Sequence, residues 1–262
     1  MDEIALQRHA TKLAINERRF QLALKRAMDV SLSLAALMIF SPVFLLIAIA
    51  VRIDTPGPVI FKHRRIGKHG RPFDLYKFRS MAVGGDDHGY LRYLQELIES
   101  SKNGGGKPYR KMSEDPRVTR VGRLLRNYYL DELPQLWNIL KGDMSLVGPR
   151  PHVQLEVDHY TPEQRRRLLV RPGATGLWQV QGKGDCTFDE LLALDIQYVE
   201  TWSLALDLKL IWQTVYLILG GGEGLWARMH KAAPRTPSEA TSAHAEARAL
   251  AADKLPQEVI GD

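Results

Sequence analysis

An uncharged apolar segment with a proline at its centre constrains this chain most. Residues 30–51 are 22 positions without a formal charge, of which 18 are apolar. About 20 such residues in a helix span the hydrocarbon core of a bilayer. A buried core helix usually keeps one polar face, and a cleaved signal peptide has a shorter apolar run and a less acidic leader. We therefore predict that the segment lies in a membrane.

The dipeptide Ser41-Pro42 lies at the midpoint of this segment and predicts a break there. Proline removes a backbone donor and kinks a helix, and the Ser41 hydroxyl can bond a carbonyl freed at the kink. Each arm of about 11 residues reaches roughly 16 Å, to about mid-bilayer. Basic residues flank both ends, and such flanks favour the cytoplasm. We predict a re-entrant hairpin rather than a straight span, with residues 5 and 70 on one face of the membrane.

The net charge of +6 arises in one stretch, because residues 52–79 alone sum to +6. A local basic stretch implies a local anionic partner: nucleic acid, lipid headgroups or a phosphorylated substrate. The adjacent membrane segment favours lipid phosphate, and we expect no nucleic-acid binding.

The mean hydropathy of −0.23 argues against several membrane spans. The single cysteine, Cys186, excludes an internal disulfide.

The rest of the chain predicts an α+β fold that is mostly helical. Residues 59–66 and 73–78 are β-prone and flank a turn at 67–70, which indicates a short β-hairpin. Residues 90–98, 118–141, 163–170 and 204–219 are expected to be helical, the last as either an interfacial helix or a packed core helix. We divide the chain into an amphipathic helix lying on the membrane surface (1–29), a re-entrant membrane helix (30–52), a cytoplasmic domain (53–220, with a polar insertion at 84–112) and a disordered tail (221–262).

Two adjacent acids, Asp131 and Glu132, form the densest cluster of candidate chemistry. Pro134 and the apolar residues after it predict a helix start with Asp131 as N-cap, ended by Gly142. The acids are then either a cap and a first-turn acid, or a functional pair. At a helix start both carboxylates can face one site, where free amides suit a phosphate. Such a pair could hold Mg²⁺, and one member could attack phosphorus.

Phosphate chemistry also needs cations in constrained positions. Arg150 lies between two prolines, so its backbone is nearly fixed. The alternative for each cation is a solvated turn or an outward-facing strand charge. The eight histidines are scattered, and we expect them at the surface; the run Gly104-Gly105-Gly106-Lys107 lacks the Ser/Thr of a phosphate loop and is expected to be a flexible link. The candidate substrate-binding residues are Lys77, Arg79, Arg150, Arg171 and Gln179.

Six motifs in order resemble the bacterial sugar transferases that are small monotopic phosphoglycosyl transferases. The resemblance covers about residues 24–219. The motifs are Lys25-Arg26-Ala27-Met28-Asp29 with Ser41-Pro42, Gly57-Pro58-Val59-Ile60-Phe61, Lys77-Phe78-Arg79-Ser80-Met81, Asp131-Glu132-Leu133-Pro134-Gln135, Gly148-Pro149-Arg150-Pro151, and Arg171-Pro172-Gly173 with Thr175-Gly176-Leu177-Trp178-Gln179-Val180.

The resemblance implies a re-entrant helix broken at Ser41-Pro42 and a catalytic pair, Asp131 and Glu132. In the family the Asp attacks the β-phosphate of a UDP-sugar and expels UMP, and undecaprenyl phosphate then takes the phosphosugar. Mg²⁺ is required, the Glu assists the metal or the incoming phosphate, and the arginine matching Arg150 binds phosphate. The resemblance thus implies an enzyme of bacterial glycan assembly on the cytoplasmic face of the inner membrane.

The chain also departs from the family pattern. Longer members carry four more membrane helices, and the 84–112 insertion and the tail are this chain's own; these differences leave a homo-oligomer open. The alternative hypothesis is a non-catalytic membrane-anchored module that binds anionic lipid or a partner enzyme. The sugar transferred and the glycan made cannot be predicted from these motifs.

Overall fold

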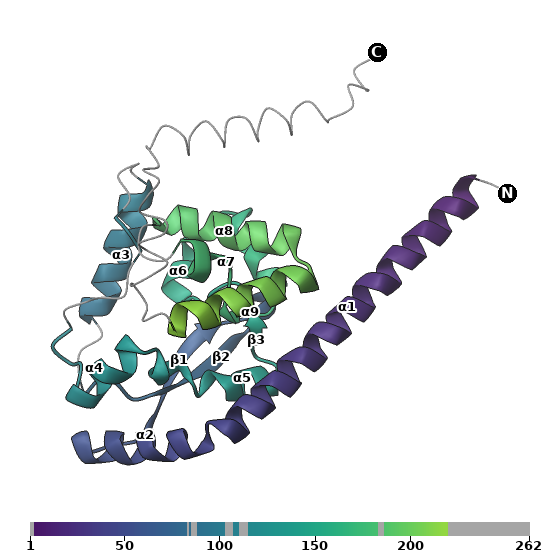
Figure 1. Ribbon diagram of the computed structural model, residues 1–262. Helices are drawn as coiled ribbons and strands as arrows, with labels where there is room; N and C mark the ends of the chain where they lie inside the picture. The colour runs from purple at the N-terminus through teal and green to yellow at the C-terminus, as the bar shows by residue number, and fades with distance from the viewer. Residues whose placement is uncertain are drawn as a thin grey trace, which may run out of the picture. The chain divides into compact units, whose positions relative to one another are not determined.

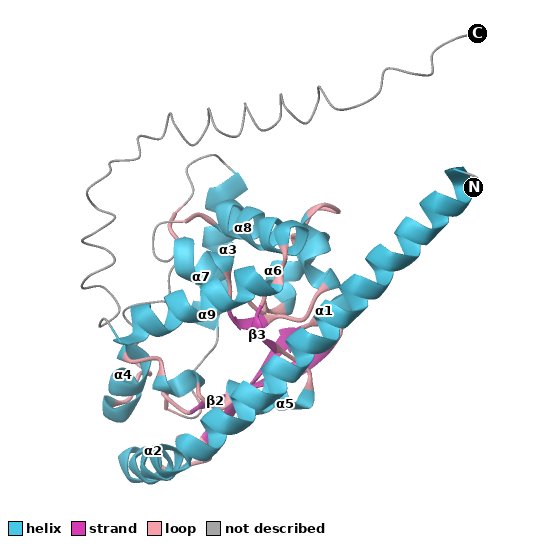
Figure 2. Cartoon of the chain, turned by 45° about the vertical axis from the view of Figure 1, so that its right-hand side comes forward, coloured by secondary structure: helices cyan, strands magenta, loops and turns pink. Residues whose placement is uncertain are grey.

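The computed structural model describes residues 3–82, 84, 88–102, 107–109, 115–182 and 186–219, with the side chains of those from residue 19 onward except residues 88, 102 and 219 (Figure 1). This part of the chain is mostly helical, with two small two-stranded sheets, so the predicted α+β class is confirmed. Helices enclose the few strands (Figure 2). The predicted tail at 221–262 and the predicted glycine link lie outside the described residues, apart from Lys107.

Two long helices open the described chain: α1 (Glu3–Ile39) and α2 (Ser41–Asp54). Helix α1 runs without interruption through the predicted boundary between residues 29 and 30. The carboxylate of the buried Asp29 is satisfied there by the Ser145 hydroxyl at 3.0 Å and the Leu146 amide at 2.9 Å. The predicted break is confirmed, because the helix axis bends by 62° between Ile39 and Ser41.

The local chemistry of the break follows the prediction. Pro42 lies in the first turn of α2, where its missing N–H costs no helix bond. The Ser41 hydroxyl donates to the Met38 carbonyl at 2.8 Å. Among the described helices, none is by itself long and apolar enough to cross a bilayer, whereas Arg19–Ile39 and Ser41–Asp54 together have the required length and composition.

The predicted β-hairpin is confirmed. Strand β1 (Ile60–Ile66) pairs antiparallel with β2 (Pro72–Phe78) across the short 3₁₀ turn η1 (Lys68–Gly70). In this turn His69 and Gly70 adopt positive φ angles of 58° and 74°. The register places Phe61 opposite Lys77.

The predicted helix at 118–141 is interrupted. It consists of α4 (Arg120–Asn127), the 3₁₀ turn η2 (Leu130–Glu132) and α5 (Gln135–Lys141). The prediction that Asp131 is an N-cap is therefore wrong: Asp131 lies inside η2, and α5 starts only at Gln135. From η2 into α5, the backbone amides of Glu132, Leu133 and Leu136 instead each donate to the carbonyl three residues earlier. Gly142, with φ of 88°, ends α5 as predicted.

A second sheet holds two loops together. Strands β3 (Ser145–Val147) and β4 (Gly173–Thr175) run parallel. The backbones touch so closely at Gly148 and Gly173 that a Cβ on Gly148 would lie 2.5 Å from the Arg171 carbonyl oxygen, and one on Gly173 would lie 2.1 Å from the Gly148 nitrogen. Both glycines are required by this contact, which fixes the Gly148–Pro151 loop against the Arg171–Gly173 loop.

The largest core cluster joins α3 (His88–Lys102), α6 (Gln154–Asp158), α7 (Leu177–Gln181) and α8 (Phe188–Thr201). Leu94, Leu97 and Ile98 of α3 are buried in it, so the helix of the predicted polar insertion belongs to the core. The predicted helix at 163–170 is the 3₁₀ helix η3 (Gln164–Leu169).

The last described helix, α9 (Leu204–Leu219), has two different sides. Leu210 and Asp207 are fully buried, whereas Trp212 is 71% exposed and Leu208 is 56% exposed. One side of α9 thus packs in the core, which agrees with the packed core helix, one of the two predicted alternatives. The other side of α9 presents large apolar side chains.

Polar side chains of α1 anchor this helix to the rest of the domain. Lys25 Nζ lies 2.6 Å from Asp207 Oδ2 of α9 and 3.0 Å from the Val147 carbonyl oxygen. Arg26 donates to two carbonyls at the C-terminal end of α5, those of Ile139 at 2.6 Å and Leu140 at 2.7 Å. The basic residues of this motif therefore act as internal anchors.

Candidate functional site

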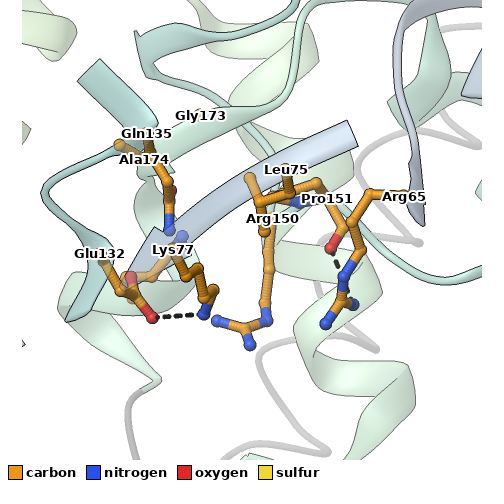
Figure 3. Close-up of a pocket in the computed structure, with 10 residues that line it drawn as sticks. Arg65, Leu75, Lys77, Glu132, Gln135, Arg150, Pro151, Gly173 and Ala174 are labelled. Atoms are coloured by element: carbon orange, nitrogen blue, oxygen red, sulfur yellow. Dashed lines mark hydrogen bonds and ion pairs between the residues drawn. The ribbon is translucent and has the colours of Figure 1, made fainter. Parts of the chain in front are cut away.

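A pocket lies where β2, η2, α5 and α7 meet the two glycine-linked loops (Figure 3). It brings together three of the predicted substrate-binding residues and one of the predicted catalytic acids. Its lining residues are Arg65, Leu75, Lys77, Glu132, Gln135, Arg150, Pro151, Gly173, Ala174 and Gln179.

An ion pair between β2 and η2 forms one end of the pocket. Lys77 Nζ lies 3.0 Å from Glu132 Oε1, and the two side chains are 17% and 22% exposed (Figure 3). Partial burial strengthens such a pair relative to one in open water. It also leaves both groups accessible to a ligand, so the ammonium can meet a phosphate while the carboxylate remains beside it.

Arg150 points into the same pocket from the Gly148–Pro151 loop (Figure 3). Its guanidinium carbon lies 5.4 Å from the centre of the Trp178 ring, a cation–π distance. Two hydrogen bonds hold the loop backbone: Arg167 donates to the Arg150 carbonyl at 2.6 Å, and Arg65 donates to the Pro151 carbonyl at 3.2 Å. Fixing the backbone in this way pre-positions the guanidinium for an oxyanion.

A buried ionic network supports that loop. Arg167 pairs with Asp195 of α8, and both side chains are almost fully buried. His152, immediately after the loop, has no exposed surface and its Nδ1 lies 2.6 Å from the Tyr160 hydroxyl. Burial, with Arg167, Arg150 and Arg65 nearby, lowers the pKa of His152 well below its usual value. His152 is therefore neutral in the folded protein.

His63, on β1, is a second neutral histidine beside the pocket. Burial, reinforced by the positive charges of Arg65, Lys77 and Arg150, lowers its pKa to about 3. Its Nδ1 lies 3.2 Å from a guanidinium nitrogen of Arg65. Because a guanidinium only donates, Nδ1 must accept, and the ring proton lies on Nε2. The prediction that the histidines lie at the surface is wrong for His152, whereas His63 is half-buried.

The structure separates two predicted substrate-binding residues from the pocket. Arg79 is 4% exposed and donates to the carbonyls of Val51, Thr55 and Pro56, at the C-terminal end of α2. Arg171 is exposed and donates to the Gly142 carbonyl at 2.8 Å. Both arginines therefore neutralise helix C-terminal ends, where cations are favoured.

Asp131 has a different environment from its neighbour Glu132. It is 4% exposed, and it does not line the pocket. Tyr129, two residues earlier, has a left-handed backbone with φ of 58°. Such a conformation is uncommon for a bulky residue and often marks a constrained functional turn. Asp131 thus follows a constrained turn and directly precedes the pocket carboxylate.

Sequence reasoning missed Arg65 and Gln135, which also line the pocket. The two-residue repeat of the predicted strand could have indicated Arg65. In the observed register Arg65 and His63 lie on the same strand face, which they share with Leu75 and Lys77. Gln179 lines the pocket as predicted, and its buried Oε1 has no hydrogen-bond partner within the described part of the chain. That oxygen is available to a ligand donor.

Asp131 and Glu132 are the magnesium ligands predicted from the sequence. No group of three or more His, Cys, Asp or Glu side chains suited to a metal occurs in the described residues. Mg²⁺ is commonly held by one or two carboxylates together with substrate phosphates and water. Asp131 and Glu132 supply two carboxylates on consecutive residues, and the remaining ligands would come from substrate and solvent.

A carboxylate and three cations in one pocket, beside a bent pair of apolar helices, define a site suited to phosphate-bearing ligands. The family model described as bacterial sugar transferase matches residues 20–221. The chain belongs to this family.

Curated proteins are similar to the chain over most of its length. The exopolysaccharide production protein ExoY of Sinorhizobium fredii is 43% identical over 193 residues, which is 73% of this chain and 83% of the relative. The undecaprenyl-phosphate galactose phosphotransferase of Salmonella typhimurium is 40% identical over 219 residues, 83% of this chain but 44% of the relative. The UDP-glucose:undecaprenyl-phosphate glucose-1-phosphate transferase of Caulobacter vibrioides is 41% identical over 203 residues, 74% and 69% of the two chains.

Proposed function

We propose that this protein transfers a hexose-1-phosphate from a UDP-sugar to undecaprenyl phosphate and releases UMP. The observation that carries the proposal is the convergence of Lys77, Glu132 and Arg150 in one pocket. The names of the Salmonella and Caulobacter relatives support the same lipid acceptor, with galactose in one and glucose-1-phosphate in the other. The reaction would be the first membrane step in the synthesis of a bacterial exopolysaccharide, capsule or O-antigen.

In the first step, a carboxylate oxygen of Asp131 attacks the phosphorus that bears the sugar. The bond from this phosphorus to the bridging oxygen breaks, and UMP leaves with that oxygen. An aspartyl phosphate carrying the sugar remains. Lys77 and Arg150 stabilise the negative charge that develops on the phosphate oxygens.

In the second step, a phosphate oxygen of undecaprenyl phosphate attacks the same phosphorus. The bond to the Asp131 oxygen breaks, which restores the carboxylate and gives a lipid-linked diphosphate sugar. Glu132, paired with Lys77, keeps the ammonium beside the reacting phosphate. Mg²⁺, held by Asp131 and Glu132, would supply additional charge neutralisation for the diphosphate.

The proposed acceptor lies in a membrane, and the bent pair α1 and α2 supports that location. The outer surface of α2 is strongly apolar: Leu45 is 63% exposed, Leu46 67% and Ile53 80%. Surfaces of this kind are covered by lipid or by another protein. We propose that the pair forms a re-entrant hairpin in the inner membrane and that the pocket faces the cytoplasm.

The test is UMP release from a panel of UDP-sugars by purified protein in nanodiscs containing undecaprenyl phosphate and Mg²⁺. We expect one or more sugars to support turnover, and Asp131→Asn to reduce it by at least about 10³-fold. Asp158→Asn, which changes an exposed acid on α6, is the matched control and should keep wild-type turnover. Full turnover in Asp131→Asn would refute the nucleophile. Lipid binding without UMP release from any sugar would support the non-catalytic module instead.

A further inference from the structure

The pocket face of the hairpin continues beyond the residues that line the pocket. Side chains alternate between the two faces of a strand, and directly paired residues share a face. Leu75 and Lys77 line the pocket, and their partners across the hairpin are His63 and Phe61. His63 and Phe61 therefore extend the pocket face on the β1 side, with Phe61 directly opposite Lys77 and His63 in the next pair along the same face of the hairpin.

A third aromatic residue completes this side. The His63 ring centre lies 5.7 Å from that of Phe61 and 6.3 Å from that of Tyr90, with interplanar angles of 56° and 63°. Tyr90 belongs to α3, so the hairpin and the inserted helix contribute together. Phe61 is 49% exposed, and His63 and Tyr90 are half-buried. We call Phe61, His63 and Tyr90 the aromatic wall.

The aromatic wall also offers a directed hydrogen-bond donor. Arg65 donates to Nδ1 of His63, so the proton of this imidazole lies on Nε2. Within the described residues, no hydrogen bond to that Nε2 is present. A half-buried ring N–H without a partner can donate to a carbonyl oxygen of a ligand, at a position where water is partly excluded.

The order of charges gives the pocket a direction. In Figure 3, the side chains run from Glu132 through Lys77 and Arg150 to Arg65. Arg65 in turn contacts His63 of the aromatic wall. A diphosphate that lies along the cations therefore has one end near the carboxylate of Glu132 and the other near Arg65 and the His63 ring of the aromatic wall.

We propose that the aromatic wall binds the nucleobase of the nucleoside diphosphate sugar, with the His63 Nε2–H donating to a base carbonyl oxygen. This proposal rests on the proposed function and adds an orientation to it. The flat ring of a pyrimidine stacks on aromatic side chains, and its carbonyl oxygens accept hydrogen bonds. The sugar then lies at the opposite end, next to Glu132 and Asp131.

The test compares the affinities of UDP and pyrophosphate for the full chain in nanodiscs, measured by calorimetry with Mg²⁺ present. Pyrophosphate occupies the cations alone, whereas UDP also has a base. We expect UDP to bind more tightly than pyrophosphate to the wild type. His63→Phe, which keeps a ring and removes the donor, and Tyr90→Ala should each weaken UDP binding by about tenfold and leave pyrophosphate binding unchanged. Intact pyrophosphate binding also shows that each variant is folded.

Two controls separate this proposal from the proposed function. Lys77→Ala should weaken both ligands, and Tyr128→Ala, which removes an aromatic ring that is 58% exposed and does not line the pocket, should weaken neither. Wild-type UDP affinity in both aromatic-wall variants would overturn the nucleobase site while UMP release still supports the transferase. Equal affinities of the wild type for UDP and pyrophosphate would overturn it as well. Absence of UMP release with intact UDP discrimination would contradict the transferase and leave the base site standing.

Discussion

The side-chain amide of Asn138 bonds the backbone of β2 at Tyr76: Asn138 Oδ1 accepts from the Tyr76 amide at 2.9 Å, and Nδ2 donates to the Asp74 carbonyl at 2.7 Å. Asn138 lies on α5 and has no exposed surface. The Asn138 side chain therefore bonds backbone groups on the edge of β2 that faces away from β1. Since Lys77 follows Tyr76 and η2 precedes α5, this bond also sets the position of Lys77 relative to Glu132.

Replacing Asn138 should destabilise the domain. In Asn138→Leu the Tyr76 amide and the Asp74 carbonyl both lose their buried partner, and each such loss costs about 1–3 kcal/mol. We expect the free energy of unfolding to fall by about 2–6 kcal/mol in urea titrations monitored by tryptophan fluorescence in detergent. Asn127→Ala, an exposed asparagine at the end of α4, is the control and should change it by less than about 0.5 kcal/mol. Equal stability of the two variants would show that the bond is dispensable.

The anchor between α1 and α9 gives a second prediction. Lys25 Nζ pairs with Asp207 Oδ2 at 2.6 Å, with side-chain exposures of 14% and 0%. Within the described part of the chain, Lys25→Met leaves a buried carboxylate with the Tyr198 hydroxyl and the Trp202 indole as its remaining side-chain donors. Removing one partner of a buried pair costs about 3–5 kcal/mol, which thermal unfolding of the detergent-solubilised protein can detect.

The matched control for this anchor is an exposed pair of similar chemistry. Arg64 and Asp74 lie 3.1 Å apart, with side-chain exposures of 63% and 41%. Arg64→Ala should cost less than about 1 kcal/mol, because solvent screens exposed pairs. If Lys25→Met lowers the stability of the protein no more than Arg64→Ala does, α1 does not depend on the Lys25–Asp207 pair.

The hairpin was predictable because its signals are local: two β-prone runs around a glycine-bounded turn. Gly142 was predictable for the same reason, since a glycine after an apolar helix commonly ends it. Asp131 was misplaced because Pro134 is compatible with a helix start and also with the series of tight turns that the chain adopts. Local spacing did not distinguish these two solutions.

Arg79 and Arg171, two of the predicted substrate-binding residues, lie outside the pocket. Each is a cation within a motif, yet each bonds main-chain carbonyls at a helix end. The helix ends they meet are distant in sequence, at residues 51–56 and 142. Conversely, Arg65 was missed because a cation in a basic strand resembles a solvated one until the opposite strand and the Gly148–Pro151 loop enclose it.

The neutral histidines predict a loss of stability in mild acid. The pKa of His63 is lowered to about 3 and that of His152 lies well below 6.5. Below pH 6.5 the unfolded chain therefore binds more protons than the folded one, and the free energy of unfolding decreases as the pH falls. Each histidine contributes a slope of up to about 1.4 kcal/mol per pH unit. His63→Gln should reduce the slope between pH 6.5 and 5 in urea titrations; an unchanged slope would show that His63 becomes charged in the folded protein.

The bend at Phe40 predicts the topology of the N-terminal helices. Pro42 fits the first turn of α2 but lacks the N–H that would continue α1. If α1 and α2 form a re-entrant hairpin, residues before and after it lie on one face of the membrane. In a Cys186→Ser background, Ala5→Cys and Lys68→Cys should both react with an impermeant maleimide in inverted vesicles and resist it in spheroplasts. Pro42→Ala allows one continuous helix and should move a fraction of one of these sites to the opposite face. Labelling of residues 5 and 68 from opposite faces in the chain that retains Pro42 would show instead that the bent pair crosses the bilayer.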